Sequence, residues 1–211
     1  RRIGEHAGSL QLPDDRDYVS YLSIKYSHPT WLVTYLLHRL GDAAERALAE
    51  NNTAPPVTAR VNTLKATQET AVGALEAEDV TVRAHAFLPD ALVLSHSGSI
   101  EALRAFQEGY IAIQDAASQL DVLALDPQPG DRVLDMCAAP GGKTFAMAAR
   151  MENRGSITAC DVYEQRLGLI DKDAVRLGAR IVTTKRSDGT VAEPAFTGKF
   201  DRVLVDAPCS G

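Results

Sequence analysis

The stretch Asp131–Thr144, with the sequence DRVLDMCAAPGGKT, decides how this chain is expected to fold. It begins with a short, mostly apolar run, Val133, Leu134 and Met136, which stops at a Pro-Gly-Gly turn. Thr144 then opens a segment, TFAMAARM, whose apolar residues recur at helical spacing. The pattern predicts a strand, a tight turn and a helix, with the helix N-terminus at the carboxyl end of the strand. Such a crevice suits a nucleotide-like ligand.

Three cofactor types compete for this turn. Gly142, Lys143 and Thr144 match the end of a phosphate-binding loop, G-x-x-x-x-G-K-[ST], but Cys137 stands where its first glycine is required. The dinucleotide fingerprint G-x-G-x-x-G does not occur there either. S-adenosylmethionine is the third candidate, because it has no phosphate and needs a turn that admits a methionine tail and a sulfonium.

Two motifs together give the chain a family resemblance. CAAPGGKT at Cys137–Thr144 and DAPCSG at Asp206–Gly211 resemble the Nol–Nop–Sun family of RNA cytosine-5 methyltransferases, particularly its bacterial ribosomal-RNA branch. The phrase PPVTARVNTLKAT, Pro55–Thr67, resembles the small RNA-contacting subdomain of these enzymes. GYIAIQDAASQL, Gly109–Leu120, resembles their lead into the cofactor pocket. The resemblance implies S-adenosyl-L-methionine as the cofactor and RNA, above all ribosomal RNA, as the partner.

Length and composition fit one good domain plus a smaller one. The 211 residues are 45% hydrophobic and 24% charged, with a net charge of -6, which leaves room for a local basic groove rather than a broad basic surface. No apolar run approaches the ~18 residues of a membrane span, and no metal is expected. Three cysteines, Cys137, Cys160 and Cys209, fit reduced thiols in the cytoplasm. The N-terminus has neither a signal peptide nor a methionine, so we expect the chain to begin inside a longer protein.

The fold class is α/β, in three parts. Residues 1–53 are expected to form a helical linker, 54–125 the small α/β subdomain with the lead into the pocket, and 126–211 the first half of a Rossmann-like methyltransferase domain. Strands and helices alternate from 131 to 205, which predicts a parallel sheet with right-handed crossovers.

The residues before the turn have simple structural interpretations, and some of them have a functional alternative. Residues 1–23 read as a connecting segment, and Trp31, on a helix ending near Gly41, as a core anchor. Arg60 and Lys65 are either phosphate contacts or, more simply, solvated charges. Gln114 and Asp115 either support the pocket or form a strand end followed by a capped helix, 116–125.

The resemblance and the strand pattern together name the cofactor residues. Asp161 ends the second strand, twenty positions after Gly141, where an acidic residue is expected to accept from the ribose hydroxyls. Asp188, in the turn RSDGT, matches the family's adenine-contacting aspartate. Asp206 ends the last strand beside the cofactor and the flipped base; an aspartate binding magnesium in an NTPase is the rival interpretation. The turn residues implied to hold the cofactor are Cys137, Ala138, Ala139, Pro140, Gly141, Gly142 and Lys143.

Catalysis at cytosine C5 requires a thiolate to add to C6 before the methyl group is transferred. By its resemblance to the family, Cys209 matches the cysteine that assists release of the product. The family's nucleophile belongs to a later Thr-Cys-Ser stretch. These 211 residues alone are therefore expected to be a poor catalyst. The remaining alternatives are a P-loop NTPase and a non-catalytic module that binds cofactor or RNA.

Overall fold

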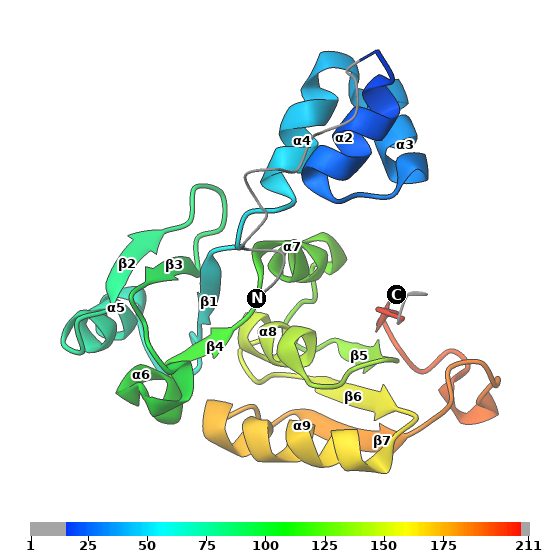
Figure 1. The fold of residues 1–211 in the computed structure, drawn as a ribbon. Helices are drawn as coiled ribbons and strands as arrows, with labels where there is room; N and C mark the ends of the chain where they lie inside the picture. The colour runs from blue at the N-terminus through cyan, green and yellow to red at the C-terminus, as the bar shows by residue number, and fades with distance from the viewer. Residues whose placement is uncertain (1–15, 208–211) are drawn as a thin grey trace. The chain divides into compact units, whose positions relative to one another are not determined.

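The computed structural model describes residues 16–207. The chain divides into two compact units, one ending at Pro55 and the other starting at Pro56 (Figure 1). The three-part boundaries expected from the sequence stay a prediction.

The first unit is a group of three helices packed around a small core. Its helices are α2 (Tyr18–Tyr26), α3 (Thr30–Leu40) and α4 (Ala44–Glu50), with a 3₁₀ turn, η2 (Gly41–Ala43), between the last two. Leu22, Val33 and Leu48 are fully buried between them. The expectation of a connecting segment up to residue 23 is wrong for α2, because Asp17 caps that helix by accepting from the backbone N–H of Ser20.

Trp31 is not the core anchor that the helical spacing suggested. Its side chain is 69% exposed, and Val33 is the buried residue of α3. The prediction failed because spacing shows which residues share a face of a helix but not which face is buried.

The second unit begins with a four-stranded antiparallel sheet of order β2-β3-β1-β4. Its strands are β1 (Val57–Val61), β2 (Thr81–Ala84), β3 (Ala91–Ser95) and β4 (Ile111–Ile113). Its helices are α5 (Gln68–Glu76) and α6 (Arg104–Gln107), with a 3₁₀ turn, η3 (Ile100–Ala102), before α6. Ala59 and Val61 of β1 face the core that α5 and α6 share with the sheet. We call this part the small subdomain.

Arg60 is not a solvated charge. Alternation along β1 turns it away from the core formed by Ala59 and Val61, yet its side chain is only 6% exposed. Lys65 lies beyond the end of β1, is exposed, and donates to the carbonyl oxygen of Glu108 at 3.2 Å.

The helix after β4 follows the prediction. It is α7 (Ala116–Leu125), and the carboxylate of Asp115 accepts from the backbone N–H groups of Ala117 and Ser118 at 2.8 and 3.1 Å. The capping interpretation of Asp115 is therefore confirmed.

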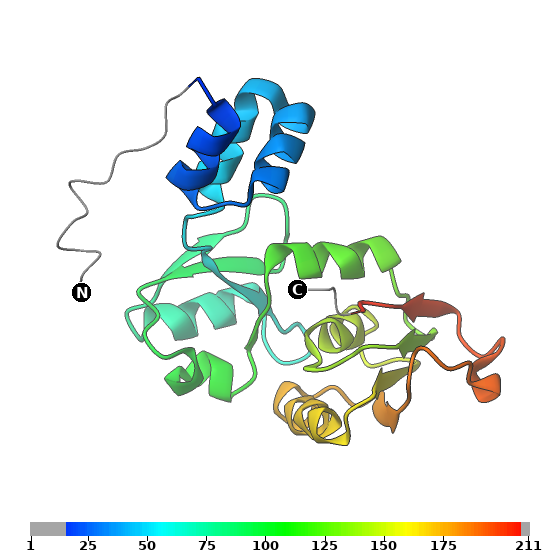
Figure 2. The same cartoon turned by 45° about the vertical axis from the view of Figure 1, so that its right-hand side comes forward.

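The rest of the unit is a parallel sheet of order β7-β6-β5-β8, as the alternating pattern predicted (Figures 1 and 2). Its strands are β5 (Arg132–Asp135), β6 (Ser156–Asp161), β7 (Val182–Arg186) and β8 (Arg202–Leu204). Its helices are α8 (Gly142–Arg150) and α9 (Glu164–Leu177), and a 3₁₀ turn, η4 (Pro194–Phe196), precedes β8. Buried residues of α7, α8 and α9 form one core with Val133, Ile157 and Ala159, which lie on one face of β5 and β6.

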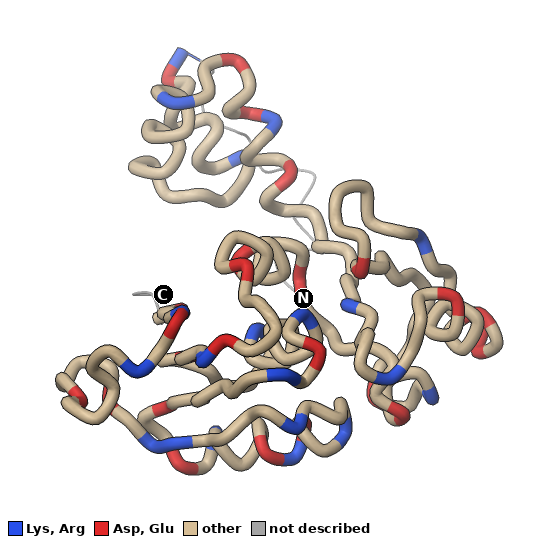
Figure 3. The backbone as a smooth tube through the Cα atoms, turned by 180° about the vertical axis from the view of Figure 1, so that it is seen from behind, with Lys and Arg blue, Asp and Glu red and all other residues tan. Residues whose placement is uncertain are grey.

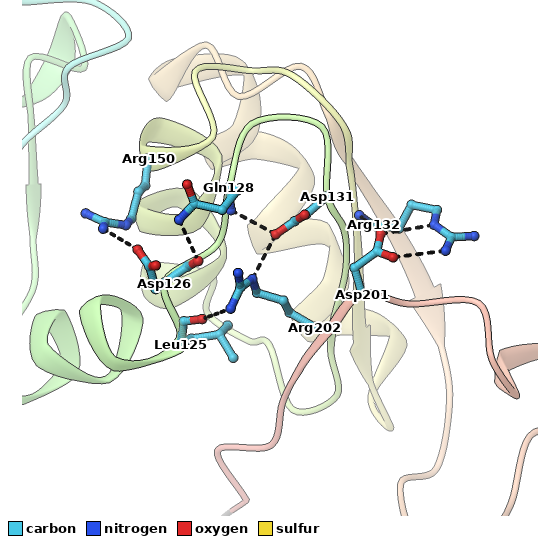
Figure 4. A network of polar contacts seen from close by, with 8 residues as sticks. All are labelled: Leu125, Asp126, Gln128, Asp131, Arg132, Arg150, Asp201 and Arg202. Carbon is cyan, nitrogen blue, oxygen red and sulfur yellow. Dashed lines mark hydrogen bonds and ion pairs between the residues drawn. The ribbon is translucent and has the colours of Figure 1, made fainter.

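A polar network holds the starts of β5 and β8 to the loop after α7 (Figure 4). Arg202 donates to Asp131 at 2.8 Å and to the carbonyl oxygen of Leu125 at 2.7 Å. Arg132 contacts both carboxylate oxygens of Asp201, and these hydrogen bonds lower the pKa of Asp201 to about 2. The network lies at the amino ends of the strands, so it fixes the sheet while leaving the carboxyl ends open for a site.

The small subdomain and the parallel sheet are joined closely within this unit. The amide of Asn62 donates to the carbonyl oxygens of Gly109 and Leu177, both at 2.8 Å. Arg176 of α9 donates to the carbonyl oxygen of Phe106 and lies 4.0 Å from its ring centroid. A Cβ on Gly109 would stand 2.2 Å from the backbone oxygen of Arg176, so only glycine permits this approach.

Candidate active site

The glycine turn between β5 and α8 has the predicted strand–turn–helix form. Gly141 has a φ of 107°, and a Cβ there would lie 2.5 Å from the ring of Phe145. Its N–H donates to the carbonyl oxygen of Ala138 at 2.7 Å, which closes the turn. The N–H of Ala138 donates to the carbonyl oxygen of Cys160 at 2.7 Å, which ties the turn to β6. The turn is thus fixed to two neighbouring strands at their carboxyl ends.

A cavity of about 280 Å³ opens beside this turn. It brings together seven residues that the sequence named, namely Cys137, Ala138, Ala139, Pro140, Gly142, Lys143 and Asp206. The other residues that line it are Ile113, Gln114, Asp115, Ser118 and Asp135. Gln114 and Asp115 were candidates for this position, whereas Asp135 was not.

Lys143 lies between two carboxylates at the mouth of this cavity. Its ammonium group forms an ion pair with Asp206 and a second one, 3.1 Å long, with Asp121 of α7. Burial lowers the pKa of Lys143, but the contacts with Asp206 and Asp121 outweigh it and leave the pKa above its usual value. Lys143 is therefore a stable cation that holds Asp206 against the turn.

Asp135 is a buried acid that the sequence analysis missed. It ends β5, is 1% exposed, and accepts from the Thr144 hydroxyl at 2.7 Å. Its second oxygen, Oδ1, is buried and has no hydrogen-bond partner within residues 16–207. Burial raises the pKa of Asp135 to about 6, although the Thr144 bond acts in the opposite direction. The signal was present, since Asp135 is an acid at the carboxyl end of a buried strand, and ligands bind at that edge of a parallel sheet.

Asp161 and Asp188 do not line the cavity. Asp161 ends β6, is 5% exposed, and accepts from the N–H of Tyr163 at 2.9 Å, with Arg166 3.6 Å from its other oxygen. Asp188 is exposed, and its Oδ1 accepts from both the N–H and the hydroxyl of Thr190. Their cofactor roles stay predictions.

The thiols that the structure describes are poor nucleophiles. Burial, followed by the charge of Asp161, raises the pKa of Cys137. Burial in β6 raises the pKa of Cys160 to about 11. Both thiols therefore stay protonated near neutral pH, and the thiolate is the reactive form. Cys209 lies outside the residues that the structure describes.

Other features of residues 16–207 bear on the kind of site. No helix there is long and apolar enough to cross a membrane. That part of the chain contains no cluster of three or more His, Cys, Asp or Glu side chains able to hold a metal ion. Acidic and basic residues alternate along the sequence of α9, and Figure 3 shows residues of both charges interspersed along the described chain. A larger cavity, about 690 Å³, lies between Leu88–Asp90 and the later residues of α8, but none of the predicted cofactor residues lines it.

A parallel sheet, a glycine turn after its first strand and an acid at the end of the second define a Rossmann-like domain, a fold class in which ligands bind at the carboxyl ends of the strands. Two family models match this chain. One, described as 16S rRNA methyltransferase RsmB/F, matches residues 122–211, and the other, a ferredoxin-like domain of RsmF/B-like methyltransferases, matches residues 28–101. The chain belongs to the RsmB/F family of methyltransferases, within the Nol–Nop–Sun group that its motifs resemble.

Individual relatives agree with the family models. The chain is 40% identical to a probable ribosomal RNA small subunit methyltransferase B of Bacillus subtilis, over 92% of this chain and 44% of the relative. It is 37% identical to a ribosomal RNA small subunit methyltransferase B of Enterobacter, over 88% of this chain and 43% of that relative. A methyltransferase homologue from Pyrococcus horikoshii has a similar structure, with a TM-score of 0.80 and 31% identity over 92% of this chain and 64% of the other. The chain thus spans less than half the length of these two curated relatives.

Proposed function

We propose that this chain is the part of a larger enzyme that binds S-adenosyl-L-methionine and helps transfer its methyl group to C5 of a cytosine in RNA, small-subunit ribosomal RNA above all. The observation that carries the proposal is the cavity at the glycine turn, where Lys143 holds Asp206 opposite the buried Asp135. The family to which the chain belongs supports methyl transfer. The proposed location is the cytoplasm, where ribosomal RNA is modified and thiols stay reduced.

The cofactor would bind across the carboxyl ends of β5, β6 and β7. The turn from Cys137 to Lys143 would hold its methionine part, Asp161 its ribose and Asp188 its adenine. The cofactor supplies an activated methyl group on a sulfonium. The carboxylates of Asp135 and Asp206 give the cavity an acidic lining that suits a cationic ligand.

The residues of this chain would position the base and assist its release. Asp206, oriented by Lys143, is placed to hydrogen-bond the edge of a flipped cytosine as charge develops on the ring. A thiolate outside residues 1–211 would add to C6, and C5 would then take the methyl group. Loss of the C5 proton expels the thiolate and restores the aromatic ring. We assign this release step to Cys209.

The contacts of Lys143 and Thr144 argue against a P-loop NTPase. In such an enzyme the lysine binds phosphates and the threonine hydroxyl binds magnesium. Here Lys143 is paired with Asp121 and Asp206, and Thr144 is fully buried with its hydroxyl donated to Asp135. Two acids beside the lysine would also repel phosphates.

The cofactor proposal is tested by titrating the chain with S-adenosylmethionine, GTP and ATP by calorimetry. We expect binding of S-adenosylmethionine alone. Asp161→Ala should weaken it by about 1–3 kcal/mol, because buried partners are left unpaired, and Asp42→Ala, an exposed residue of the first unit, should not. Magnesium-dependent GTP binding without S-adenosylmethionine binding would reject the proposal. Cofactor binding without methyl transfer in the length-completed protein would favour the non-catalytic module.

The role of Cys209 is tested in the length-completed protein. Cys209→Ala should still attack C6 and transfer methyl, and then stay covalently joined to the RNA, which a denaturing gel detects. Replacement of the downstream cysteine should abolish the adduct. An RNA adduct formed by residues 1–211 and removed by Cys209→Ser would make Cys209 the nucleophile instead.

A further inference from the structure

Arg60 and Gln114 form a buried hydrogen bond between the small subdomain and the cofactor cavity. The Nε–H of Arg60 donates to Oε1 of Gln114 at 2.8 Å, and both side chains are 6% exposed. The backbone of Gln114 is held at both its polar groups, since its N–H donates to Thr58 and its carbonyl oxygen accepts from the amide of Gln119. Gln114 lines the cavity at the glycine turn, whereas Arg60 does not.

This bond decides which way the Gln114 amide faces. A glutamine amide carries an acceptor oxygen on one side and a donor NH₂ group on the other. Because the guanidinium of Arg60 is only a donor, the oxygen must face it. The Nε2 group then faces α8, and it lies 3.9 Å from the position of a Cβ on Gly142, the first residue of that helix.

Both partners are left with unused donors. Nε2 of Gln114 and Nη2 of Arg60 are buried without a hydrogen-bond partner in the part of the chain that the structure describes. No carboxylate in that part lies within ion-pair distance of Arg60, although the charge of Asp90 acts on it from further away. Burial lowers the pKa of Arg60 to about 10, so the side chain stays charged at neutral pH. A buried donor or charge of this kind costs free energy until an acceptor arrives.

The beginning of α8 lies on the other side of the same position. Its first N–H groups have no partner within the helix, and its dipole favours negative charge there. A donor amide, a helix N-terminus and a buried cation behind the amide therefore converge on one wall of a cavity that otherwise contains acids. That wall suits a carboxylate.

We infer that Arg60 is a positioning residue: it orients the Gln114 amide so that, with the N-terminus of α8, it forms a subsite for the α-carboxylate of the ligand's amino-acid part. The inference rests on the proposed cofactor and names the part of it that this wall recognises. It also gives the small subdomain a direct role in cofactor binding, which is separate from any contact with RNA.

A pair of ligands separates this role from a merely structural one. S-adenosylhomocysteine contains the amino-acid carboxylate, and 5′-methylthioadenosine has the same nucleoside and thioether without it. We expect Arg60→Met in the full chain to weaken S-adenosylhomocysteine on the order of 10- to 100-fold by calorimetry, the range for a lost hydrogen bond to a charged group. Its affinity for 5′-methylthioadenosine should be unchanged. Arg83→Met, an exposed arginine of the same subdomain, is the matched control and should change neither.

Gln114→Glu keeps the test decisive if Arg60→Met fails to fold. A glutamate gives Arg60 a counter-charge, so this variant should melt no lower than the natural chain, and it should repel the carboxylate. It should therefore lose S-adenosylhomocysteine and retain 5′-methylthioadenosine.

Each other outcome overturns the inference. Equal losses for both ligands would show that Arg60 only supports the fold, and unchanged affinities would show that the bond is irrelevant to binding. A loss of affinity for an RNA oligonucleotide, with S-adenosylhomocysteine unaffected, would assign the donors to a phosphate. If the natural chain binds neither ligand, the proposed function fails together with the inference. If the natural chain binds both ligands and the variants show no selective loss of S-adenosylhomocysteine, only the carboxylate subsite is rejected.

Discussion

The carboxyl group of Asp135 is held where its charge is disfavoured. Its pKa in the fold is about 6 against an ordinary 3.8, because burial removes the ionised form from water. The folded protein therefore binds this proton more tightly than the unfolded chain does, so stability falls as the pH rises from about 4 to 6. Above that range the full penalty of about 2–3 kcal/mol remains. An enzyme tolerates such a cost where the charge serves a ligand.

The first prediction follows from this fall in stability with rising pH. Asp135→Asn should raise the free energy of unfolding at pH 8 by about 1–2 kcal/mol, and the gain should vanish below pH 4, where the acid is neutral in both states. Denaturant unfolding at the two pH values measures it. Asp201→Asn is the control of opposite sign, because the Arg132 bonds lower that pKa and stabilise the fold above it. If Asp135→Asn is less stable than the natural chain at pH 8, the fold stabilises the ionised carboxylate of Asp135, and the prediction is wrong.

Residues of the site were predictable to different degrees. Every residue of the turn from Cys137 to Lys143 except Gly141 lines one cavity together with Asp206, which follows β8, because the carboxyl ends of parallel strands share an edge. The buried bond of Arg60 could not be predicted, since it depends on the antiparallel pairing of β1 with β4, which brings together residues far apart in the sequence. Asp121 pairs with Lys143 because that face of α7 is turned toward the lysine. Sequence spacing does not determine how a helix is turned about its own axis.

At the scale of single elements, α3 offers a simple test through Trp31, the one tryptophan in the sequence. Because the indole is 69% exposed, its fluorescence should show the red-shifted emission of a solvated tryptophan and should be quenched by iodide. Trp31→Ala should change stability by no more than about 0.5 kcal/mol. Leu22→Ala, fully buried in the same unit, should cost about 2–5 kcal/mol. Blue-shifted, unquenched emission would place Trp31 in a core after all.

The approach of the turn before β4 to α9 gives the next prediction. Gly109→Ala combines a φ of 73° with a Cβ that would stand 2.2 Å from the oxygen of Arg176, so it should cost at least about 3 kcal/mol. Gly98→Ala has a comparable φ of 55° and nothing within 4 Å of its Cβ, and it should cost only about 1 kcal/mol. The difference in unfolding free energy isolates the steric contact. Equal costs would mean that the subdomain shifts to admit the methyl group.

The elements themselves were largely predictable where periodicity was clear. The limits of α7 and the parallel order of the second sheet agree with the sequence, because capping and crossover rules are local or nearly so. The helix α2 was missed because it is short and Leu22 is its only fully buried residue. Its stability comes from packing against α3 and α4, which no local pattern reveals.

At the scale of the molecule, the second unit combines two sheets of different type in one compact unit. The small subdomain is antiparallel and the larger sheet parallel, and the bonds from Asn62 and Arg176 cross between them. Sequence patterns indicated both sheets separately. They did not indicate the junction, because the side chains of Asn62 and Arg176 donate there to backbone carbonyl groups, which any sequence possesses.

The Asn62 amide has a consequence for the order in which a ribosome makes this chain. Leu177, one of its two acceptors, is synthesised 115 residues later, so one buried N–H of Asn62 lacks its partner until α9 emerges. We predict that stalled nascent chains ending before α9 leave the small subdomain open to protease, and that chains extending well past it are protected. Equal protection at both lengths would show that the subdomain matures without α9. On the expected result, the part of this unit that is translated first is the part that is finished last.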